Sequence, residues 1–330
     1  MNQRIIVNKP GGLDALTFVE EQEPVPSGSQ VKVRIQAAGV AFGDVMLRRG
    51  VGRPASRYPV TPGYDFAGVV EALGPGVSSF RVGDPVAGLP FTGGYQQFIC
   101  LPEAEVFPVP QGLSPDDVVS VMLNYTTALG MLTRAARLKA GDTALIHGAA
   151  GGVGTAMLQL ARLHGVKMYG TVSSGKMDLV RQLGGLPINY TQTDFVRELR
   201  TLEPGGVTAV FDGVGGAQLS RSYRVLAWNG TLVFFGASSA MSGGHPLVGL
   251  AGTLGRMGLL KLRPGAKRVV PFFRRTPPEQ LRQDVTALLK LLEEGKIDPQ
   301  IAQVLPLAQA ALAQELLEGA KVMGKIILHP

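Results

Sequence analysis

A glycine-rich loop between two structured segments constrains the fold of this chain more than any other feature. The loop, Gly148 to Gly154, reads GAAGGVG and follows the short apolar run Ala144 to His147. Val153, Met157, Leu160 and His164 then recur at helical spacing. Small residues in such a loop let backbone N–H groups reach the pyrophosphate of a dinucleotide, and the helix start adds partial positive charge. The sequence therefore predicts a dinucleotide site, with a purely structural tight turn as the alternative.

A regular alternation of strand-like and helix-like segments surrounds this loop. A helix is predicted at Lys176 to Leu183, and further helical stretches separate the later strands. Alternation of this kind indicates a parallel sheet covered by helices on both sides, the doubly wound α/β (Rossmann) fold. Besides the strand before the loop, the predicted strands are Val166 to Val172, Pro187 to Tyr190, Val207 to Phe211 and Leu232 to Phe235.

The first 124 residues have a different texture, in which short alternating runs are separated by Gly and Pro turns. Val31 to Ile35 alternates apolar with basic residues, as in a half-buried strand. The density of such runs predicts an antiparallel, barrel-like domain. Further strand candidates are Gly68 to Glu71, Pro85 to Ala87 and Gln97 to Ile99.

The last 55 residues carry helical patterns and a final strand. Thr276 to Glu279 has the composition of a helix capping box, Gly295 is placed to end that helix, and Lys325 to Leu328 is strand-like. Because this segment follows the alternating region, we expect it to complete the first domain. The predicted domains are residues 1–124 with 275–330 for the substrate, and residues 125–274 for the dinucleotide.

Composition narrows the functional class without deciding it. Of 330 residues, 45% are hydrophobic and 17% are charged, as in a folded globular protein. One cysteine, Cys100, suits a reducing cytoplasm, and no apolar run is long enough for a membrane span. The net charge of +7 gathers partly between Arg256 and Arg275, without zinc-finger or RNA-binding signatures. We expect a cytoplasmic protein that binds neither nucleic acid nor membrane.

The end of the second predicted strand bears on the choice of dinucleotide. A site for NAD usually has Asp or Glu about 20 residues beyond the glycine loop, where it binds the ribose 2′-hydroxyl. Here the sequence from Thr171 to Lys176 is TVSSGK, which offers hydroxyls and an ammonium group but no carboxylate. This favours NADPH, although Lys176 could instead begin a solvated helix.

Several motifs together resemble the medium-chain dehydrogenase/reductase superfamily over nearly the whole chain. The resemblance is to its zinc-free quinone oxidoreductase branch, with vesicle-amine-transport-like proteins nearest, and it implies a GroES-like first domain. The motifs are Gly39-Val40 with Phe42 and Asp44, Val60 to Val70, Gly83 to Val86, Asn124 to Ala128, the glycine loop, and Gly324-Lys325.

The resemblance also implies roles for individual residues. Asp44 lies in the substrate-side motif. The implied cofactor contacts are Gly151, Gly152, Val153 and Gly154 at the pyrophosphate; Ser173, Lys176 and Tyr190 around the 2′-phosphate; Thr127 and Gly236, Ala237 and Ser238 near the nicotinamide; and Lys325. Tyr190 could equally be a packed aromatic at a strand end.

Zinc ligands are missing at the positions where zinc-dependent relatives carry them. Ala41 to Asp44 contains no Cys, and Tyr64-Asp65 replaces a His-Glu pair. A zinc site needs three or four Cys, His or carboxylate ligands. The possible donors, Cys100, His147, His164, His245 and His329, are scattered along the sequence. We therefore expect no metal.

Without a metal, the expected reaction is transfer of hydride from NADPH to a quinone or an α,β-unsaturated carbonyl compound. Tyr64 or Tyr125 could supply the proton, although packing roles explain both equally well. Ala41 and Met46 stand where many quinone reductases have Asn and Tyr. Two alternatives remain: an NADPH-binding protein with little catalysis that serves a structural or membrane-associated role, and an enoyl-thioester reductase.

The segment Ala266 to Phe273 corresponds in the family to an edge strand that joins two cofactor domains across a dimer. Pro271 within it fits an edge strand, because proline cannot donate a ladder hydrogen bond. We expect a homodimer formed through residues 266–273.

Overall fold

The computed structural model describes residues 1–51, 58–241, 246–272 and 276–330. The chain divides into two compact units, and each is described by itself. The first unit comprises Met1–Thr126 and Pro278–Pro330, and the second comprises Thr127–Pro277. Of the predicted features, His245 and residues 273–275 lie outside the described residues. No helix in the described part of the chain is both long and apolar enough to cross a membrane.

The second unit is built on a six-stranded sheet in which every neighbouring pair is parallel. The strand order is β10-β9-β8-β11-β12-β13, so the chain moves outward from β8 in one direction and then in the other. This is the 3-2-1-4-5-6 order of doubly wound dinucleotide-binding domains, and it confirms the predicted fold. The strands are β8 (Thr143–His147), β9 (Lys167–Val172), β10 (Leu186–Asn189), β11 (Val207–Asp212), β12 (Leu226–Phe234) and β13 (Arg268–Pro271).

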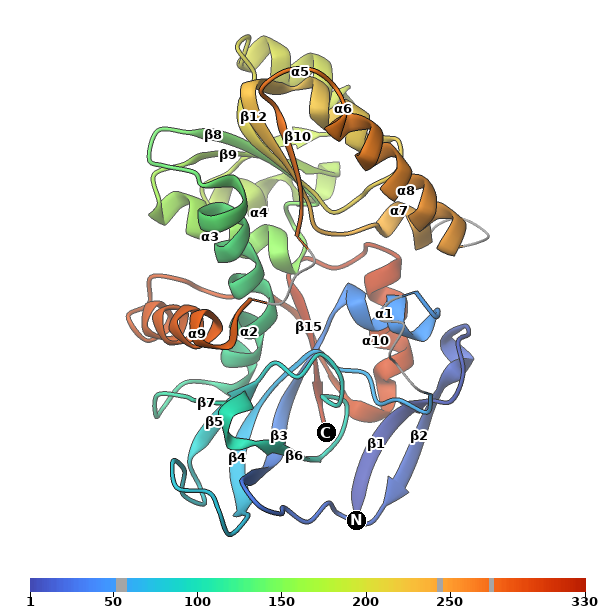
Figure 1. Cartoon of the computed structure of the whole chain (residues 1–330), viewed down its shortest axis with the longest axis vertical. Coiled ribbons are helices and arrows are strands. Elements are labelled where there is room, and N and C mark those ends of the chain that lie inside the picture. The colour runs from blue at the N-terminus through green and yellow to red at the C-terminus, as the bar shows by residue number, and fades with distance from the viewer. Residues whose placement is uncertain (52–57, 242–245, 273–275) are drawn as a thin grey trace. The chain divides into compact units, whose positions relative to one another are not determined.

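Helices cover both faces of this sheet because each parallel connection crosses over it (Figure 1). The connections from β8 through β9 to β10 move along the sheet in one direction, and those from β10 through β11 and β12 to β13 move in the other. Their helices therefore cover opposite faces. The first group is α3 (Gly152–Leu163) and α4 (Met177–Gln182); the second is α5 (Phe195–Leu202), α6 (Gln218–Arg224), α7 (Ser238–Met241) and α8 (Pro246–Lys261).

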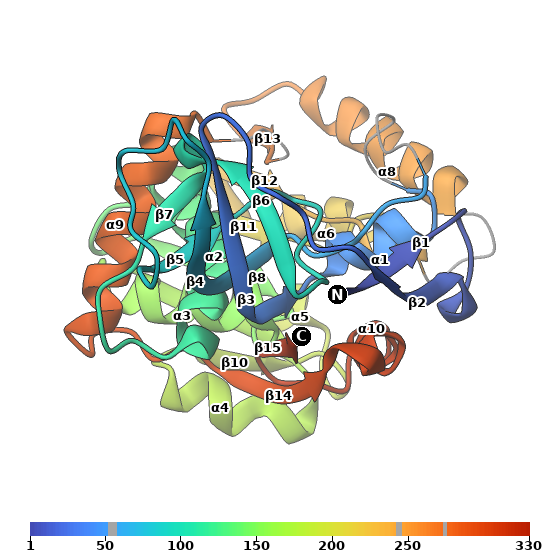
Figure 2. The same cartoon turned by 90° about the horizontal axis from the view of Figure 1, so that it is seen from below.

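The first unit is built on a mainly antiparallel sheet around the long strand β3 (Gln30–Val40). Figure 2 shows β7, β5, β4, β3 and β6 in that order. The core lies against β3, where Val31, Val33 and Ile35 are buried. The predicted antiparallel domain is confirmed. Its other strands are β1 (Asn2–Val7), β2 (Leu16–Glu21), β4 (Asp65–Leu73), β5 (Pro85–Gly88), β6 (Phe98–Pro102), β7 (Val106–Pro108), β14 (Ile301–Pro306) and β15 (Lys325–His329).

The C-terminal segment completes this sheet. The predicted final strand is β15, which pairs antiparallel with β3 and parallel with β14, a strand that the sequence patterns did not indicate. The predicted helix is α9, which begins at Pro278. Gly295, in a left-handed conformation with φ of 66°, follows its end. The helices of this unit are α1 (Phe42–Arg48), α2 (Pro115–Gly130, which runs into the second unit), α9 (Pro278–Glu293) and α10 (Ala310–Glu318).

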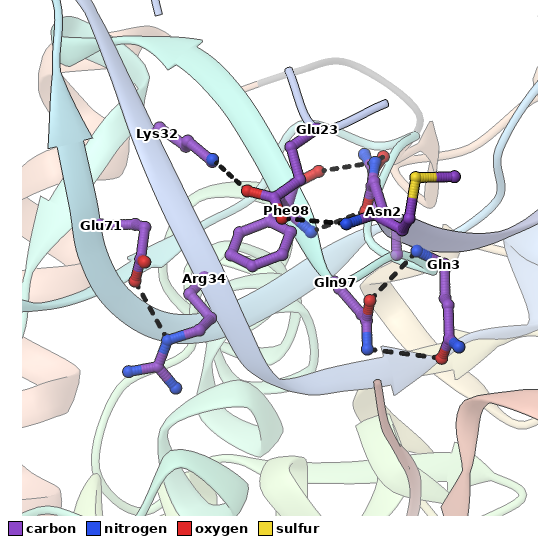
Figure 3. Close-up of polar contacts among 10 residues, drawn as sticks. Asn2, Gln3, Glu23, Lys32, Arg34, Glu71, Gln97 and Phe98 are labelled. Atoms are coloured by element: carbon purple, nitrogen blue, oxygen red, sulfur yellow. Dashed lines mark hydrogen bonds and ion pairs between the residues drawn. The ribbon is translucent and has the colours of Figure 1, made fainter. Parts of the chain in front are cut away.

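Polar contacts attach the β1–β2 hairpin to β3 and β6 (Figure 3). The Asn2 amide donates to Gln96 Oε1 at 3.1 Å, and its Oδ1 accepts from the Phe98 N–H at 3.0 Å. Lys32 donates to Glu23 at 2.7 Å, and its Nζ lies 4.6 Å from the centroid of the Phe98 ring. Lys32 is therefore buried, whereas the alternation in β3 predicted that its side chain would face solvent as that of Arg34 does.

Candidate functional site

The glycine loop lies between the carboxyl end of β8 and the start of α3, as predicted. Gly148 has a φ of 70°, a conformation that favours glycine, and its carbonyl accepts from the Gly151 N–H at 3.0 Å. No side chain caps α3 at Gly151. Since the first N–H groups of a helix have no partner within it, this end of α3 can bind an anion.

Gly154 is required by packing within the loop itself. A Cβ atom at this position would lie 2.4 Å from the Gly148 oxygen and 2.6 Å from the carbonyl carbon and oxygen of Ala149. At Gly151 the nearest atom to such a Cβ would be 3.4 Å away. The last glycine of the motif thus lets α3 start close to the strand, while the earlier ones leave space above the loop.

The ends of β9 and β10 bring together the residues expected at the 2′-phosphate. The Asn189 amide donates to Ser174 Oγ at 2.9 Å, and Asn189 Oδ1 accepts from Thr191 Oγ1 at 2.7 Å. Partial burial lowers the pKa of Lys176, which lies in the turn after β9. Ser173 is half-buried beside this cluster, and the Tyr190 side chain is 57% exposed. The contact of Asn189 with Ser174 was missed in the sequence because the two residues are 15 positions apart and meet only where β9 and β10 end.

Two further loops lie side by side at the carboxyl ends of β11 and β12. The Ser238 N–H donates to the Gly213 carbonyl at 3.1 Å, and the Ser239 N–H donates to Val214 at 3.0 Å. The predicted segment Gly236 to Ser238 is therefore fixed against the loop that follows Asp212. Thr127 lies on α2, at the start of the second unit.

A chain of buried polar side chains connects four elements, β8, β9, β11 and α6, and no sequence motif indicated it. His147 Nδ1 is 2.9 Å from Thr171 Oγ1, and His147 Nε2 is 2.9 Å from Ser222 Oγ. Ser222 donates to Asp212 Oδ2 at 2.7 Å. All four side chains are at most 5% exposed. Because the partners are 10 to 75 residues apart in the chain, only the folded arrangement brings them together.

In the first unit, Asp44 lies within a set of hydrogen-bond donors. Its carboxylate accepts from the N–H groups of Ala41 and Gly63, each at 2.8 Å, and from the Tyr95 hydroxyl at 3.1 Å. The side chain is only 1% exposed. Burial raises the pKa of Asp44 to about 7, despite the two backbone hydrogen bonds that act in the opposite direction. Asp44 thus fastens the start of α1 to the segment at Gly63.

Ionisation of Asp44 should make the first unit less stable as the pH rises from about 4 to 7. The pKa of Asp44 in the folded chain is about 7 and lies above its ordinary value of 3.8, so the folded state holds an extra proton in this range. The contribution of Asp44 to the free energy of unfolding then falls by up to about 1.4 kcal/mol per pH unit. Urea unfolding of the wild type and of Asp44→Asn at several pH values checks this: the difference between them should shrink as the pH rises. A constant difference would contradict the assignment.

A buried ion pair connects the two segments of the chain that form the first unit, residues 1–126 and 278–330. Lys325 Nζ lies 3.1 and 2.9 Å from the two carboxylate oxygens of Asp65, and Asp65 Oδ2 also accepts from the Leu123 N–H at 3.1 Å. The resemblance implied that Lys325 contacts the cofactor. In the structure its amine instead donates hydrogen bonds to Asp65 within the first unit. The Tyr64 ring packs edge-on against Phe91, with centroids 5.4 Å apart.

The residues at the expected zinc positions do not fit a zinc ion. Ala41 offers no ligand, and Asp65 is engaged by Lys325. Cys100 lies on β6, opposite Lys32 on β3. Within the described ranges, no three His, Cys, Asp or Glu side chains are grouped so that they could hold a metal ion.

Two family descriptions match parts of this chain. Residues 27–111 match the alcohol dehydrogenase GroES-like domain, and residues 185–328 match the family described as zinc-binding dehydrogenase. The first match covers most of the antiparallel sheet, and the second covers the later strands of the parallel sheet together with the C-terminal segment.

Individual relatives cover nearly the whole chain. The synaptic vesicle membrane protein VAT-1 homolog of Rattus norvegicus is 34% identical over 316 residues, which are 93% of this chain and 78% of that protein. A 2-haloacrylate reductase of Burkholderia sp is 32% identical over 333 residues, 98% of each chain. The structure of Escherichia coli quinone oxidoreductase complexed with NADPH has a TM-score of 0.88 at 29% identity, covering 99% of this chain and 100% of that one. With both domain types present and relatives of this extent, the chain belongs to the medium-chain dehydrogenase/reductase superfamily of oxidoreductases, alongside its quinone oxidoreductases and VAT-1 homologues.

Proposed function

We propose that this chain is an NADPH-dependent reductase that transfers hydride, without zinc, to a quinone or an α,β-unsaturated carbonyl compound. The observation that carries the proposal is the set of side chains at the end of β9. This segment provides Ser173, Ser174 and Lys176 but no carboxylate, and it lies beside the start of α3, which no side chain caps. Hydroxyls and an ammonium group suit a 2′-phosphate, whereas a carboxylate would repel it.

The substrate class is supported by the relatives and by the missing metal ligands. One relative is named a quinone oxidoreductase, and another a reductase of a 2-haloacrylate, whose double bond is conjugated with a carboxyl group. Conjugated acceptors take up hydride without a metal to polarise the oxygen, because the charge is delocalised onto that oxygen. Among the residues that the structure describes, no group of three His, Cys, Asp or Glu side chains could hold a zinc ion, which is consistent with such a substrate.

When bound, NADPH would supply hydride from C4 of its nicotinamide. The N–H groups at the start of α3, around Gly152 to Gly154, would hold the pyrophosphate, and the Gly236 to Ser238 segment with Thr127 would orient the nicotinamide. The anion formed on the acceptor then needs a proton. We propose Tyr64 or Tyr125 as its source, with Asp44 as a positioning residue. A Phe substitution at each tyrosine that leaves the rate of reduction unchanged would remove that residue from the mechanism.

Substitution of Lys176 by Ala should weaken NADPH binding about 10- to 100-fold and change NADH binding less than about twofold. A charge-assisted hydrogen bond to phosphate contributes about 1.5–3 kcal/mol, and NADH lacks the 2′-phosphate that would receive it. Fluorescence titration with both cofactors measures this. Lys139→Ala, at an exposed lysine of the same unit, is the control and should leave both affinities unchanged. Equal losses for NADPH and NADH would contradict the assignment.

Turnover tests the reaction itself. Purified protein with NADPH should reduce 1,4-quinones or enones at a rate that a zinc chelator does not alter. Crotonyl thioester as the preferred substrate would instead identify an enoyl-thioester reductase. Tight NADPH binding without turnover of any of these compounds would favour the non-catalytic role.

The non-catalytic role has one structural observation in its favour. A cavity of about 370 Å³ between α6 and α8 is lined by Ser220, Arg256, Leu259 and Arg263, among other residues. Of these lining residues, Leu259 has a side chain that is 69% exposed. An apolar surface flanked by arginines suits anionic lipid. Co-sedimentation with anionic vesicles at moderate salt tests the membrane-associated form of this second candidate, and an absence of binding would eliminate that form.

We also propose that the chain forms a homodimer through β13. This strand stands at the end of the parallel sheet, paired with β12 on one side. An exposed sheet edge is a ready surface for pairing with a second copy. The mass in solution at micromolar concentration should be that of two chains, and a monomer would refute the proposal.

A further inference from the structure

We propose that Thr171, His147, Ser222 and Asp212, here called the switch-point network, position the two strand ends that hold the dinucleotide, and that this depends on Ser222. The inference deepens the proposed function and rests on it, because it assumes that NADPH binds at the glycine loop. None of the four is among the residues expected to contact the cofactor, and they would act through the loops that follow the strands.

The location of the network is the first argument. His147 is the last residue of β8 and Asp212 the last residue of β11, and these two strands are neighbours in the sheet. Between them the strand order reverses, and ligands of doubly wound sheets bind in the crevice at this point. The glycine loop leaves β8 directly after His147. The loop fixed against Gly236 to Ser238 leaves β11 directly after Asp212.

The hydrogen bonds form one directed chain. Ser222 donates its proton to Asp212 Oδ2, so its oxygen accepts from His147 Nε2, which therefore carries the ring proton. His147 Nδ1 then accepts from the Thr171 hydroxyl. Burial lowers the pKa of His147, in agreement with a neutral ring. Each member depends on the donor or acceptor role of its neighbour.

Asp212 extends the chain into the loop beyond β11. Its Oδ1 accepts from the N–H groups of Val214 and Gly215, each at 2.9 Å. The Gly216 N–H is in turn held by Thr253 Oγ1 at 3.0 Å. At the other end, the Thr171 carbonyl accepts from the Ala149 N–H in the glycine loop at 3.2 Å. The glycine loop and the loop after β11, against which Gly236 to Ser238 is fixed, are therefore both tied to the network through backbone groups.

Ser222 is the link between the two strand ends. It lies on α6 and contacts both His147 and Asp212, and it is 0% exposed. Without its hydroxyl, the end of β8 and the end of β11 would no longer be connected through side chains of this network. Residues that only stabilise the fold would be buried in the same way. The experiment therefore measures the affinity for NADPH and the stability of each variant separately.

The experiment compares Ser222→Ala with Thr208→Val. Thr208 Oγ1 donates to Asp142 Oδ1 at 3.3 Å, which ties the opposite end of β11 to the residue before β8. Each variant removes one hydroxyl from a connection between the same two strands. Ser222→Ala should raise the Kd for NADPH about tenfold, and Thr208→Val by less than about twofold, while thermal unfolding reports the stability of each.

The outcomes separate the inference from the proposed function. If the wild type does not bind NADPH, the proposed function and this inference both fall. If it does, an unchanged Kd in Ser222→Ala, or equal changes in the two variants, overturns the inference alone.

Asp212→Asn gives a second readout in case Ser222→Ala does not fold. It keeps the size of the side chain and an oxygen for Val214 and Gly215, but it places a donor where Ser222 needs an acceptor. Nitrogen-15 NMR should find the His147 proton on Nε2 in the wild type and on Nδ1 in the variant, with weaker NADPH binding. A wild-type proton on Nδ1, or wild-type affinity in the variant, would overturn the proposal.

Discussion

Substitution of Gly154 by Ala is expected to weaken NADPH binding at least about a hundredfold. The new Cβ atom would lie 2.4 Å from the Gly148 oxygen and 2.6 Å from Ala149 backbone atoms. Backbone atoms cannot rotate away as the end of a flexible side chain can, so either the loop or the start of α3 must shift. Displacement of a binding group by about 1 Å can cost about 10²-fold, and overpacking costs about 1–3 kcal/mol of stability. Fluorescence titration and calorimetry measure the two effects.

A matched glycine elsewhere in the same unit provides the control. Gly252 lies on α8, and a Cβ atom there would meet nothing within 4 Å. Gly252→Ala should therefore leave NADPH affinity unchanged and stabilise the helix by about 0.5–1 kcal/mol, since alanine favours helix over glycine. If Gly154→Ala retained wild-type affinity, the glycine loop would not be the pyrophosphate site.

The second unit was largely predictable because its signals are local. Apolar runs of strand length, helical spacing after Gly151 and a glycine loop between them lie within about 20 residues of one another. The crossover rule then converts alternation into a doubly wound sheet without any knowledge of distant contacts. The bounds of β9, β10 and β11 differ from the prediction by one residue, whereas the strand expected at Leu232 to Phe235 begins six residues earlier, at Leu226.

The first unit was less predictable because its sheet depends on partners far apart in sequence. β15 joins β3 across nearly the whole chain, and β14 was not recognised as a strand. Lys32 was expected to face solvent but is buried. Glu23 and Phe98, which belong to other segments, contact its amine and cover it. Alternation along one strand cannot show which segments cover its second face.

The candidate site divides in the same way. The places of Gly151 and Ser173 in the fold could be predicted from the sequence, since the loop and the strand end that carry them are local. The partners of Asp44 and Lys325 could not, because a motif marks a position and not its hydrogen bonds. The switch-point network gave no sequence signal for the same reason: its members lie on two strand ends, a neighbouring strand and a helix.

Substitution of Lys325 by Met is expected to destabilise the first unit by about 3–5 kcal/mol. Asp65 is 0% exposed, and its charge would lose both contacts to Lys325 Nζ while it keeps the hydrogen bond from the Leu123 N–H of α2. Removal of one partner from a buried ion pair leaves an uncompensated charge, which is the origin of the large cost. Urea or thermal unfolding, followed for the first unit, measures the loss. Lys290→Met, at an exposed lysine 3.9 Å from Glu294, is the control and should change stability by less than about 0.5 kcal/mol.

Two further measurements distinguish the loss of charge compensation from a simple loss of packing. The double variant Asp65→Asn with Lys325→Met should regain much of the stability, because no uncompensated charge remains. The pH dependence has a definite sign as well. Burial raises the pKa of Asp65, an effect that Lys325 opposes, so Lys325→Met should raise it further. A carboxyl with a raised pKa in the folded state binds its proton more readily there than in the unfolded chain, so the deficit of Lys325→Met should shrink as the pH falls. The Lys325 side chain also lies close to Gly39, where a Cβ atom would be 2.4 Å from Lys325 Cε. A loss of stability that is independent of pH, and that the double variant does not relieve, would assign the role of Lys325 to this packing instead.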